Sequence, residues 1–375
     1  MPIATRRRKY NTPESRWAGI GPYYAMFPTS FADEVVRDYT QPGDAVIDPF
    51  AGRGTAIYSA ATQQRRAVGI EINPLGYVYA NAKLNPGDYK KVTRRLEEVA
   101  EVAPCYRQEA YSLPQFFHLC FTDKIREFLL GARATLNWRR SKTDRTLMAL
   151  ILISLHGKRY QSLSNQMRQS TAMAPAYCIR WWTEKELKPP DIDPVSFIQK
   201  RIEWRYVHGV PKLNDASVFL ANSLHKLPVL ARDVKVGRRP KAKLLFTSPP
   251  YHNVTNYYYD QWLRLWLLGC SEIPGNQKER YGGKFSNLEQ YSRLLSQVFE
   301  RTKHLLADDA IIYIRTDQRE STLKTTRTVL TEIFPEKRIA ETLCPLNPTR
   351  QTKPFSRGGA PKKTNCEVDL ILEPR

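Results

Sequence analysis

One stretch of the chain, residues 44–86, limits the possible folds more than any other. It begins with an apolar strand-like run, DAVID, and continues through a glycine-bearing turn into a helix-compatible segment, TAIYSAATQQ. A second apolar run, AVGIE, follows. This order of strand, helix and strand is typical of a βαβ unit, whose two strands lie parallel. The sequence therefore predicts an open α/β sheet.

A long helical region interrupts the alternation of strands and helices. From residue 90 to residue 205 apolar side chains recur at helical spacing, as in DKIREFLLGARATLNW and DRTLMALILISLHGKRY. Strand-like runs then return, namely KLLFTS, AIIYIRT and EVDLILE. A mostly parallel sheet with a helical insertion explains this order. We divide the chain accordingly into residues 1–89, 90–205 and 206–375.

Composition restricts the partners and the compartment. The 375 residues include 58 Lys and Arg against 37 Asp and Glu, and this net charge of +21 favours nucleic acid or an anionic membrane surface as partner. The start, MPIATRRRKY, lacks the apolar stretch of a secretory signal, and no apolar run is long enough to span a bilayer. The cysteines form no CxxC pair and the histidines show no metal-ligand spacing. We expect a reduced, cytoplasmic protein without a membrane segment, structural disulfides or a metal.

A glycine-bearing motif follows the first strand. It runs Asp48-Pro49-Phe50-Ala51-Gly52-Arg53-Gly54-Thr55, at the end of the strand where ligands of open α/β sheets bind. Glycines there let the backbone approach a ligand closely, and Glu71, at the end of the next strand, can accept hydrogen bonds from a ribose diol. An acid before only two glycines repels a pyrophosphate but suits the ammonium of a methionine moiety. The pattern favours S-adenosyl-L-methionine over NAD, and a generic strand-to-helix turn with an acidic cap is the alternative.

A second motif, Thr247-Ser248-Pro249-Pro250-Tyr251, follows the apolar run KLLF. Its two prolines stiffen the loop and remove two N–H donors, so the loop presents carbonyl groups. The Ser248 side chain and the Pro249 carbonyl can accept the two hydrogens of a ring-bound amino group, which would direct the nitrogen lone pair toward a methyl donor. Tyr251 can stack on the ring. Taken alone, the motif would more often be a turn, but a preceding buried strand and the first motif favour a catalytic loop.

Together these segments resemble the DNA amino-methyltransferases, which methylate the exocyclic nitrogen of cytosine or adenine. DPFAGRGT resembles the family's cofactor motif, AVGIEIN its acidic second motif and TSPPY its catalytic motif. GPYYAMFPTSFADEVV, residues 21–36, is similar to the segment that precedes the cofactor motif, and Asn214-Asp215-Ala216 is similar to the third motif, although the family usually has Gly-Asp-Ala. The resemblance covers residues 21–86 and 210–375.

The resemblance implies a Rossmann-like class I methyltransferase with a mostly parallel seven-stranded sheet. Residues 1–89 would form an N-terminal arm and the cofactor-binding part, and residues 206–375 the catalytic part. The implied cofactor-binding residues are Phe27, Thr29, Asp48, Pro49, Phe50, Gly52, Gly54, Thr55, Glu71, Ile72 and Asp215. The implied catalytic residues are Ser248, Pro249, Pro250 and Tyr251.

The first residue of the catalytic motif bears on the substrate. In this family, members that act on adenine usually carry Asp or Asn there, and members that act on cytosine N4 usually carry Ser, so Ser248 favours cytosine N4. Adenine N6 and an RNA or protein amide substrate are the alternatives. The expected partner is double-stranded DNA in the nucleoid, with a cognate restriction endonuclease as a candidate second partner. The sequence leaves the oligomeric state open.

The insertion, residues 90–205, is expected to recognise the target sequence. Ser164 to Arg168 and Trp181-Trp182 mix polar and aromatic groups that suit base edges and stacking, and a packed helical surface explains them equally well. A basic loop, residues 349–364, is a second candidate for phosphate contact.

Other aromatic residues and one cysteine have simpler explanations. Trp262 and Trp266 fall at helical spacing and are expected in a core, while the tyrosines at 257–259 are candidates for lining a base pocket. Pro104-Cys105 superficially matches the nucleophile of cytosine C5 methyltransferases, but an incidental cysteine is the favoured interpretation.

Overall fold

The computed structural model describes residues 10–21, 27–252, 257–274, 287–344 and 367–375. Its chain divides into two compact units. The helical unit comprises Met1–Tyr24, Val78–Lys212 and Asn256–Tyr281, and the α/β unit comprises Ala25–Tyr77, Leu213–Thr255 and Gly282–Arg375. The helical unit is therefore wider than the expected insertion of residues 90–205, because segments from both sides of the sheet sequence pack with it.

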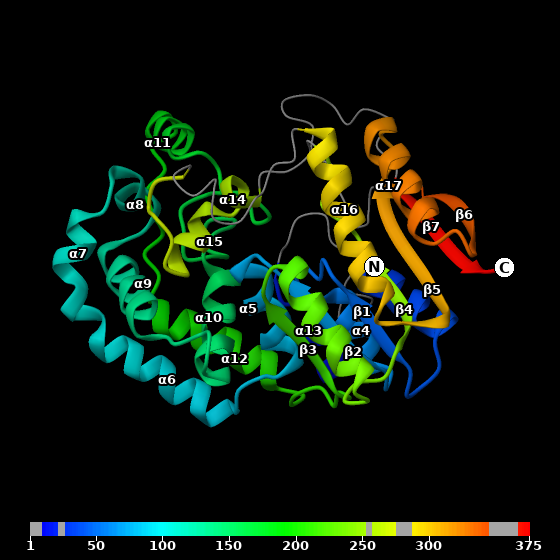
Figure 1. The fold of residues 1–375 in the computed structure, drawn as a ribbon. Coiled ribbons are helices and arrows are strands. Elements are labelled where there is room, and N and C mark those ends of the chain that lie inside the picture. Colours follow the sequence, from blue (N-terminus) through cyan, green and yellow to red (C-terminus); the bar gives the residue numbers. More distant parts are fainter. Residues whose placement is uncertain (1–9, 22–26, 253–256, 275–286, 345–366) are drawn as a thin grey trace, which may run out of the picture. The chain divides into compact units, whose positions relative to one another are not determined.

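The α/β unit is built on a seven-stranded sheet with the order β3-β2-β1-β4-β5-β7-β6 in the described part of the chain (Figure 1). Neighbouring strands are parallel from β3 to β5, and β7 is antiparallel to both β5 and β6. The predicted Rossmann-like, mostly parallel sheet is confirmed. The strands are β1 Ala45–Asp48, β2 Arg66–Glu71, β3 Ala216–Leu220, β4 Ala242–Thr247, β5 Leu306–Asp317, β6 Lys337–Cys344 and β7 Glu367–Pro374.

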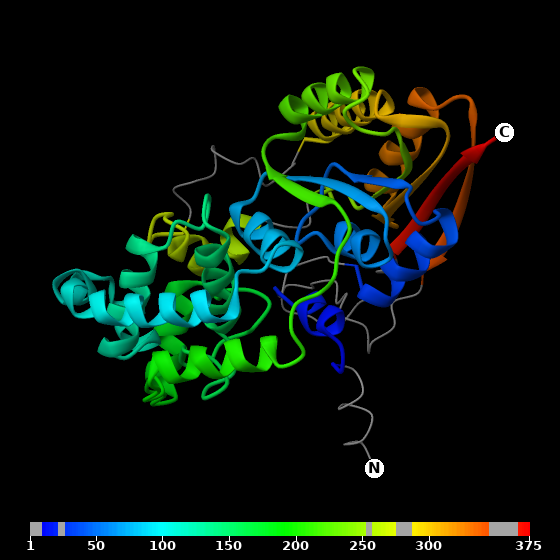
Figure 2. The same ribbon diagram turned by 90° about the horizontal axis from the view of Figure 1, so that it is seen from below.

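Helices cover both faces of this sheet. Figure 2 shows α13, α16 and α17 on one face and α3 and α4 on the other, as in a doubly wound fold. α16 shows why such a helix forms, since the Asn287 side chain caps its first turn and its apolar residues recur on one face. The helices are α3 Thr29–Tyr39, α4 Thr55–Thr62, α13 Ser223–Lys235, α16 Leu288–Lys303 and α17 Glu320–Ile333, and α5 Pro74–Leu84 leads into the helical unit.

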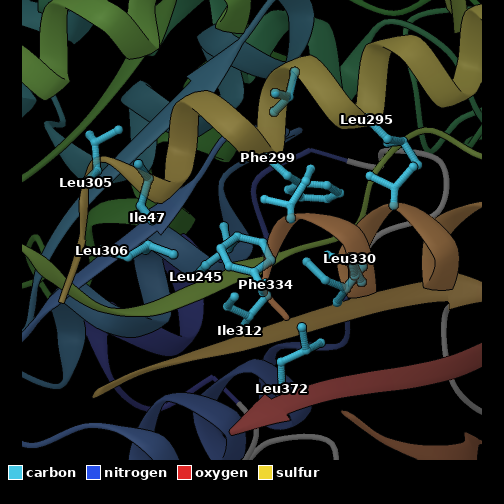
Figure 3. Packing of buried hydrophobic residues seen from close by; sticks show 14 of the residues in the cluster. Ile47, Leu245, Leu295, Phe299, Leu305, Leu306, Ile312, Leu330, Phe334 and Leu372 are labelled. Carbon is cyan, nitrogen blue, oxygen red and sulfur yellow. The ribbon is translucent and has the colours of Figure 1, made fainter. Parts of the chain in front are cut away.

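The main core of the α/β unit lies between the sheet and α16 and α17. Ile47, Leu245 and Ile312, from three neighbouring strands, are fully buried with Phe299 of α16 and Leu330 of α17 (Figure 3). Burying one such side chain stabilises a fold by about 1.5–3 kcal/mol. This core fixes the central strands, and it therefore fixes the positions of the loops that leave their carboxyl ends.

The helical unit contains both helices that the sequence analysis named within the insertion, each in shortened form. α9 ends at Thr135 and α10 at Ser154, whereas helical periodicity alone would have carried them to Trp138 and Tyr160. The described helices are α2 Pro13–Ala18, α6 Tyr89–Val102, η1 Ala103–Tyr106, α7 Arg107–Ser112, α8 Gln115–Cys120, α9 Asp123–Thr135, α10 Lys142–Ser154, α11 Pro175–Glu184, α12 Pro194–Tyr206, α14 Tyr257–Asp260 and α15 Trp262–Leu267.

An aromatic cluster forms the core of the helical unit. Trp262 and Trp266 of α15 are buried against Phe116 and Phe117 of α8, which confirms the prediction that these two tryptophans are core residues. Across the described ranges, no helix is both long and apolar enough to cross a membrane.

Candidate active site at the carboxyl edge of the sheet

Strand register brings the two predicted motifs to the same edge of the sheet. β1 lies between β2 and β4, with Asp48 paired to Gly69 and Ile47 paired to Leu245. The Thr247 hydroxyl, at the end of β4, donates a 2.5 Å hydrogen bond to the Asp48 carboxylate, at the end of β1. The glycine motif and the TSPPY motif are therefore in direct contact, although about 200 residues separate them in the sequence.

Two glycines shape the loop between β1 and α4. Gly52 and Gly54 have φ angles of 53° and 69°, in the left-handed region that strains other residues. Gly54 directly precedes α4, and its N–H group donates to the Ala51 carbonyl at 2.6 Å. The loop thus turns sharply at these two glycines, directly after β1, as the motif predicts.

Asp48 is an acid held in an apolar setting. Its side chain is 2% exposed, and it accepts the Thr247 hydroxyl and the Phe50 N–H group. Burial raises the pKa of Asp48 to about 7, and the two hydrogen bonds only partly oppose this shift. A cation beside Asp48 would favour its ionised form.

Glu71, at the end of β2, connects the neighbouring backbone segments. Its two carboxylate oxygens accept the Gly52 N–H group at 2.6 Å and the Asn73 N–H group at 2.7 Å. Burial raises the pKa of Glu71 to about 7, and the nearby charge of Asp48 adds to the shift. Because an ionised carboxylate offers about four acceptor positions, Glu71 keeps capacity for further donors.

Some residues of this site carried no signal that sequence reasoning used. Gly76 is needed because a Cβ atom there would lie 2.7 Å from the Gly52 carbonyl oxygen and 2.9 Å from the Glu71 side chain. The buried Asn73 amide nitrogen has no hydrogen-bond partner among the described residues, and the Ser223 hydroxyl donates to the Pro49 carbonyl at 2.5 Å. Asn73 is the last residue of the acidic motif AVGIEIN and Gly76 lies three residues beyond it, so the motif itself points to Asn73 and a slightly longer motif would include Gly76.

Two predicted cofactor residues, Phe27 and Thr29, lie before and at the start of α3. Phe27 is buried and stacks on Phe246 of β4 with ring centroids 4.7 Å apart. Thr29 is the first residue of α3 and half-buried. The structure therefore gives Phe27 a packing contact with the sheet, while residues 22–26 of the same segment lie outside the described residues.

Asp215 does not reach this edge of the sheet. It immediately precedes β3, and its carbonyl oxygen accepts the N–H group of Ala67 at the start of β2. Asp215 is exposed at the amino ends of the strands, whereas Gly52 and Glu71 lie at the carboxyl ends. A strand of five residues spans roughly 16 Å, so assigning Asp215 to the cofactor was wrong on geometric grounds.

The TSPPY loop leaves β4 beside Asp48. Thr247 is fully buried, Pro249 is buried, and Ser248, Pro250 and Tyr251 are half-buried. The Ser248 hydroxyl donates to the Tyr251 hydroxyl at 3.2 Å, and the Tyr251 hydroxyl donates to the Glu367 carboxylate of β7 at 3.2 Å. The loop is thereby connected to the antiparallel strand of the sheet, a link that the sequence did not predict.

Glu367 belongs to a buried charged cluster formed by β5 and β7. Arg315 of β5 contacts Glu367 at 3.5 Å and forms two hydrogen bonds with Asp369, at 2.6 Å and 2.7 Å. Tyr313 also donates to Asp369, at 2.7 Å. These strands pair with Arg315 opposite Asp369 and Asp317 opposite Glu367, which places the charged side chains side by side.

The polar residues expected to read bases in the insertion are mostly structural. Asn165 is 0% exposed, and its amide donates to the carbonyls of Leu119 and Leu187. Trp182 is buried, and its indole donates to the Gln166 carbonyl. The alternative interpretation, a packed helical surface, therefore holds for Asn165 and Trp182, while Arg168 is exposed.

The other predicted features are divided between described and undescribed residues. Cys105 is exposed on η1, and η1 lies between the helices α6 and α7 in the chain, with no strand before it in the described part of the helical unit. Within the described ranges, no three His, Cys, Asp or Glu side chains are arranged to hold a metal ion. The basic loop of residues 349–364 and the side chains of Tyr257 and Tyr258 lie outside the described residues.

The sheet order and the two adjoining motifs define a Rossmann-like methyltransferase unit. Residues 2–81 match the family model described as DNA methylase, which covers the glycine motif and Glu71 but not the TSPPY loop. Over these residues the chain is similar to the DNA methylases, in agreement with the resemblance to the DNA amino-methyltransferases and with S-adenosyl-L-methionine as the cofactor.

Curated relatives match a similar part of the chain. The type II methyltransferase M.Cfr9I of Citrobacter freundii is 39% identical over 69 residues, 18% of this chain and 22% of that protein. The type II methyltransferase M.XycI of Xanthomonas campestris pv. cyanopsidis is 34% identical over 92 residues, 24% of this chain and 30% of that protein. The chain therefore matches less than a third of the length of either relative.

A solved structure was also similar over most of the chain. TrmN from Thermus thermophilus is 11% identical, with a TM-score of 0.35, over 96% of this chain and 52% of that one. At this low similarity the strand order of the α/β unit is the better guide to the fold.

Proposed function

We propose that the protein is an S-adenosyl-L-methionine-dependent DNA methyltransferase that acts on the exocyclic N4 of cytosine. The hydrogen bond between Thr247 and Asp48 is the observation that carries the proposal, because it joins a cofactor motif to an amino-methylation motif. The DNA methylase match and the type II relatives support DNA as the substrate. Ser248, rather than an acid or an amide, supports cytosine over adenine.

The cofactor fits the residues at the sheet edge. Asp48 and Glu71 are buried acids whose raised pKa values would fall beside a cationic ligand, and S-adenosyl-L-methionine carries a sulfonium and an ammonium. Glu71 would accept the ribose hydroxyls, and the Asn73 amide offers a donor that lacks a partner among the described residues. When bound, the cofactor supplies an electrophilic methyl group.

The TSPPY loop would prepare the amino group for attack. The Ser248 hydroxyl and the Pro249 carbonyl accept its two hydrogens, which directs the nitrogen lone pair toward the methyl group. A paired base must first leave the duplex, at a cost of a few kcal/mol. Stacking on Tyr251 offsets part of this cost, since stacking on an aromatic side chain contributes about 1–3 kcal/mol. The attack is direct and needs no cysteine nucleophile.

We also propose that the helical unit contributes to recognition of the target sequence. Arg139, Arg140 and Arg168 are exposed in this unit, and exposed arginines can neutralise phosphates or pair with base edges. Because the relatives are type II methyltransferases, a restriction endonuclease of the same specificity is the proposed second partner.

Methyl transfer to three substrate classes tests the proposal. The chain is incubated with radiolabelled S-adenosyl-L-methionine and, separately, duplex DNA, RNA and protein. We expect label in DNA alone. Label in RNA alone or in protein alone would show that DNA is not the substrate. Such a result would leave the proposed amino-methyltransferase chemistry standing.

A further inference from the structure

A hydroxyl chain links the catalytic loop to an acid that neither the motifs nor the comparisons assign to the site. Ser248 donates to Tyr251, and Tyr251 donates to Glu367, with both oxygen pairs 3.2 Å apart. We infer that Glu367 is a positioning residue, the anionic end of a hydrogen-bond chain that makes Ser248 an acceptor toward the target amino group. The inference rests on the proposed function of the TSPPY loop.

The direction of the chain follows from its charged end. An ionised carboxylate can only accept hydrogen bonds, so the Tyr251 hydroxyl must donate to Glu367. The phenol oxygen then accepts the hydrogen of Ser248. With that hydrogen committed, the Ser248 oxygen presents lone pairs to any further partner. The two hydrogens of an amino group require acceptors, and a serine hydroxyl turned the other way would offer a competing donor.

Both hydrogen bonds of the chain are longer than a typical hydroxyl hydrogen bond. Hydroxyl hydrogen bonds usually measure about 2.7–2.8 Å, which is shorter than both distances here. Hydrogen bonds in a chain also polarise one another, so a charge on Glu367 strengthens the acceptor character of Ser248 through Tyr251.

The surroundings of Glu367 act on its pKa in opposite directions. Burial raises its pKa, while Arg315 of β5 and the Tyr251 hydroxyl oppose that shift. Asp369 of β7 and Asp317 of β5 raise it further. Arg315 is shared, because it also makes the two shorter bonds to Asp369. The charge on Glu367 is therefore less stabilised by Arg315 than it would be in an ion pair of its own.

The first experiment compares Glu367→Gln with a matched control, Glu373→Gln. Glu373 lies on the same strand, where it pairs with Arg338 at 2.9 Å near the surface. Methyl transfer is measured on polymerase-amplified duplex DNA of mixed sequence, and cofactor affinity by calorimetry. We expect Glu367→Gln to lower kcat about tenfold or more, as for a lost hydrogen bond to a charged group. Cofactor affinity should stay within about twofold, since Glu367 is not a cofactor residue, and Glu373→Gln should match the wild type.

A pH profile separates this role from simple support of the fold. Because the chain needs ionised Glu367, the wild-type kcat should fall as the pH drops through the raised pKa of Glu367. That acidic limb should be absent in Glu367→Gln and in Tyr251→Phe, which keeps the ring but breaks the chain. Tyr251→Phe also tests the inference if Glu367→Gln does not fold.

A rescue variant gives the clearest result. Ser248→Asp places a carboxylate acceptor directly in the loop, so adding Glu367→Gln to it should cost less than about twofold in kcat. An equal loss from Glu367→Gln in both backgrounds would overturn the inference, as would wild-type activity with an unchanged pH profile in Glu367→Gln. A wild-type chain that transfers no methyl group to DNA would instead contradict the proposed function itself.

Discussion

The carboxyl edge of the sheet and the interior of the helical unit both bury polar side chains, but they satisfy them differently. In the helical unit, Arg264 is fully buried and donates to the Leu152 and Gln169 carbonyls and to the Gln261 side chain. At the sheet edge, Glu71 accepts backbone N–H groups and keeps acceptor capacity. The comparison teaches that burial alone does not identify a site; spare hydrogen-bonding capacity does.

Removing a fully satisfied polar group should have the largest effect, and the effect should be on folding. Arg264→Leu would leave two buried carbonyls and the Gln261 amide without their donors. We expect a loss of about 3–5 kcal/mol in the free energy of unfolding, measured by denaturant titration, because each unsatisfied group costs about 1–3 kcal/mol. Arg140→Leu, at an exposed position, serves as the control and should change stability by less than about 0.5 kcal/mol. A loss below 1 kcal/mol for Arg264→Leu would break the comparison.

Removing an acid with spare capacity should act on the ligand. Glu71→Ala deletes the proposed ribose acceptor, so cofactor affinity in calorimetry should fall about tenfold to a hundredfold, the range for hydrogen bonds to a charged group. The folded variant should retain the far-ultraviolet circular dichroism of the wild type. Full affinity in a folded Glu71→Ala protein would remove Glu71 from the cofactor site.

A change in the TSPPY loop should lower the rate of methyl transfer and leave cofactor affinity unchanged. Tyr251→Ala removes the stacking surface, and methyl transfer to duplex DNA should drop about tenfold to a hundredfold, from the 1–3 kcal/mol that base stacking contributes. Calorimetry of the same variant should give a cofactor affinity close to that of the wild type. If the variant loses affinity and keeps its rate, Tyr251 belongs to the cofactor site and not to the base pocket.

The acids at the sheet edge should couple cofactor binding to pH. Asp48 and Glu71 have pKa values of about 7 in the free protein, and a bound cation would lower both. Binding should release protons near pH 7, and affinity should increase about tenfold at most for each acid as the pH rises from 5 to 8. Calorimetry in buffers of different ionisation enthalpy measures the protons released.

The same two acids also determine how the stability of the protein without cofactor changes with pH. Folding raises the pKa values of both acids. Their contribution to the free energy of unfolding is therefore fully present at a pH below their pKa values in the unfolded chain, and it is lost as the pH rises through about 7. Cofactor should reduce that loss. Cofactor binding that takes up protons, or that changes the number of bound protons by zero, would contradict the proposal that a cationic ligand lies beside these acids.

The smallest expected effect lies on the surface of the helical unit. DNA binding should weaken with salt, with a log–log slope of about −0.9 for each neutralised phosphate. If Arg139 and Arg140 touch phosphates, the double change Arg139→Gln and Arg140→Gln should flatten the slope by up to about 2. Asn165→Ala is the informative contrast, because its buried amide should affect stability and not sequence choice. Relaxed specificity in a stable Asn165→Ala protein would contradict its structural role.

Local patterns predicted the centre of the α/β unit well. The runs at β1, β2, β4, β5 and β7 are apolar because they lie within or near the centre of the sheet, so the fold class followed from them. The ends of β1, β2 and β4 also gave the positions of most of the candidate site residues. β3 and β6 lie at the two edges of the sheet, where β3 buries only its central residue and most residues of β6 are exposed. No run of the sequence indicated these two strands individually.

The wrong or missing site predictions depend on contacts between residues that lie far apart in the sequence. Asp215 was assigned across a long insertion by resemblance, but β3 starts only at Ala216, which leaves Asp215 at the wrong end of the strand. Asn165 has a polar side chain, and only the carbonyls of Leu119 and Leu187 show that it is structural. The link from Tyr251 to Glu367 depends on the antiparallel register of β5 and β7, which neither motif encodes.

The central claim is that the glycine motif and the TSPPY loop form one site for amino methylation of cytosine. The most direct test is to incubate the chain with S-adenosyl-L-methionine and unmethylated duplex DNA, digest the DNA to nucleosides and identify the modified base by mass and chromatographic standard. We expect N4-methylcytosine. N6-methyladenine would contradict the choice of base drawn from Ser248, and C5-methylcytosine or no modified base would contradict the amino-methylation site itself.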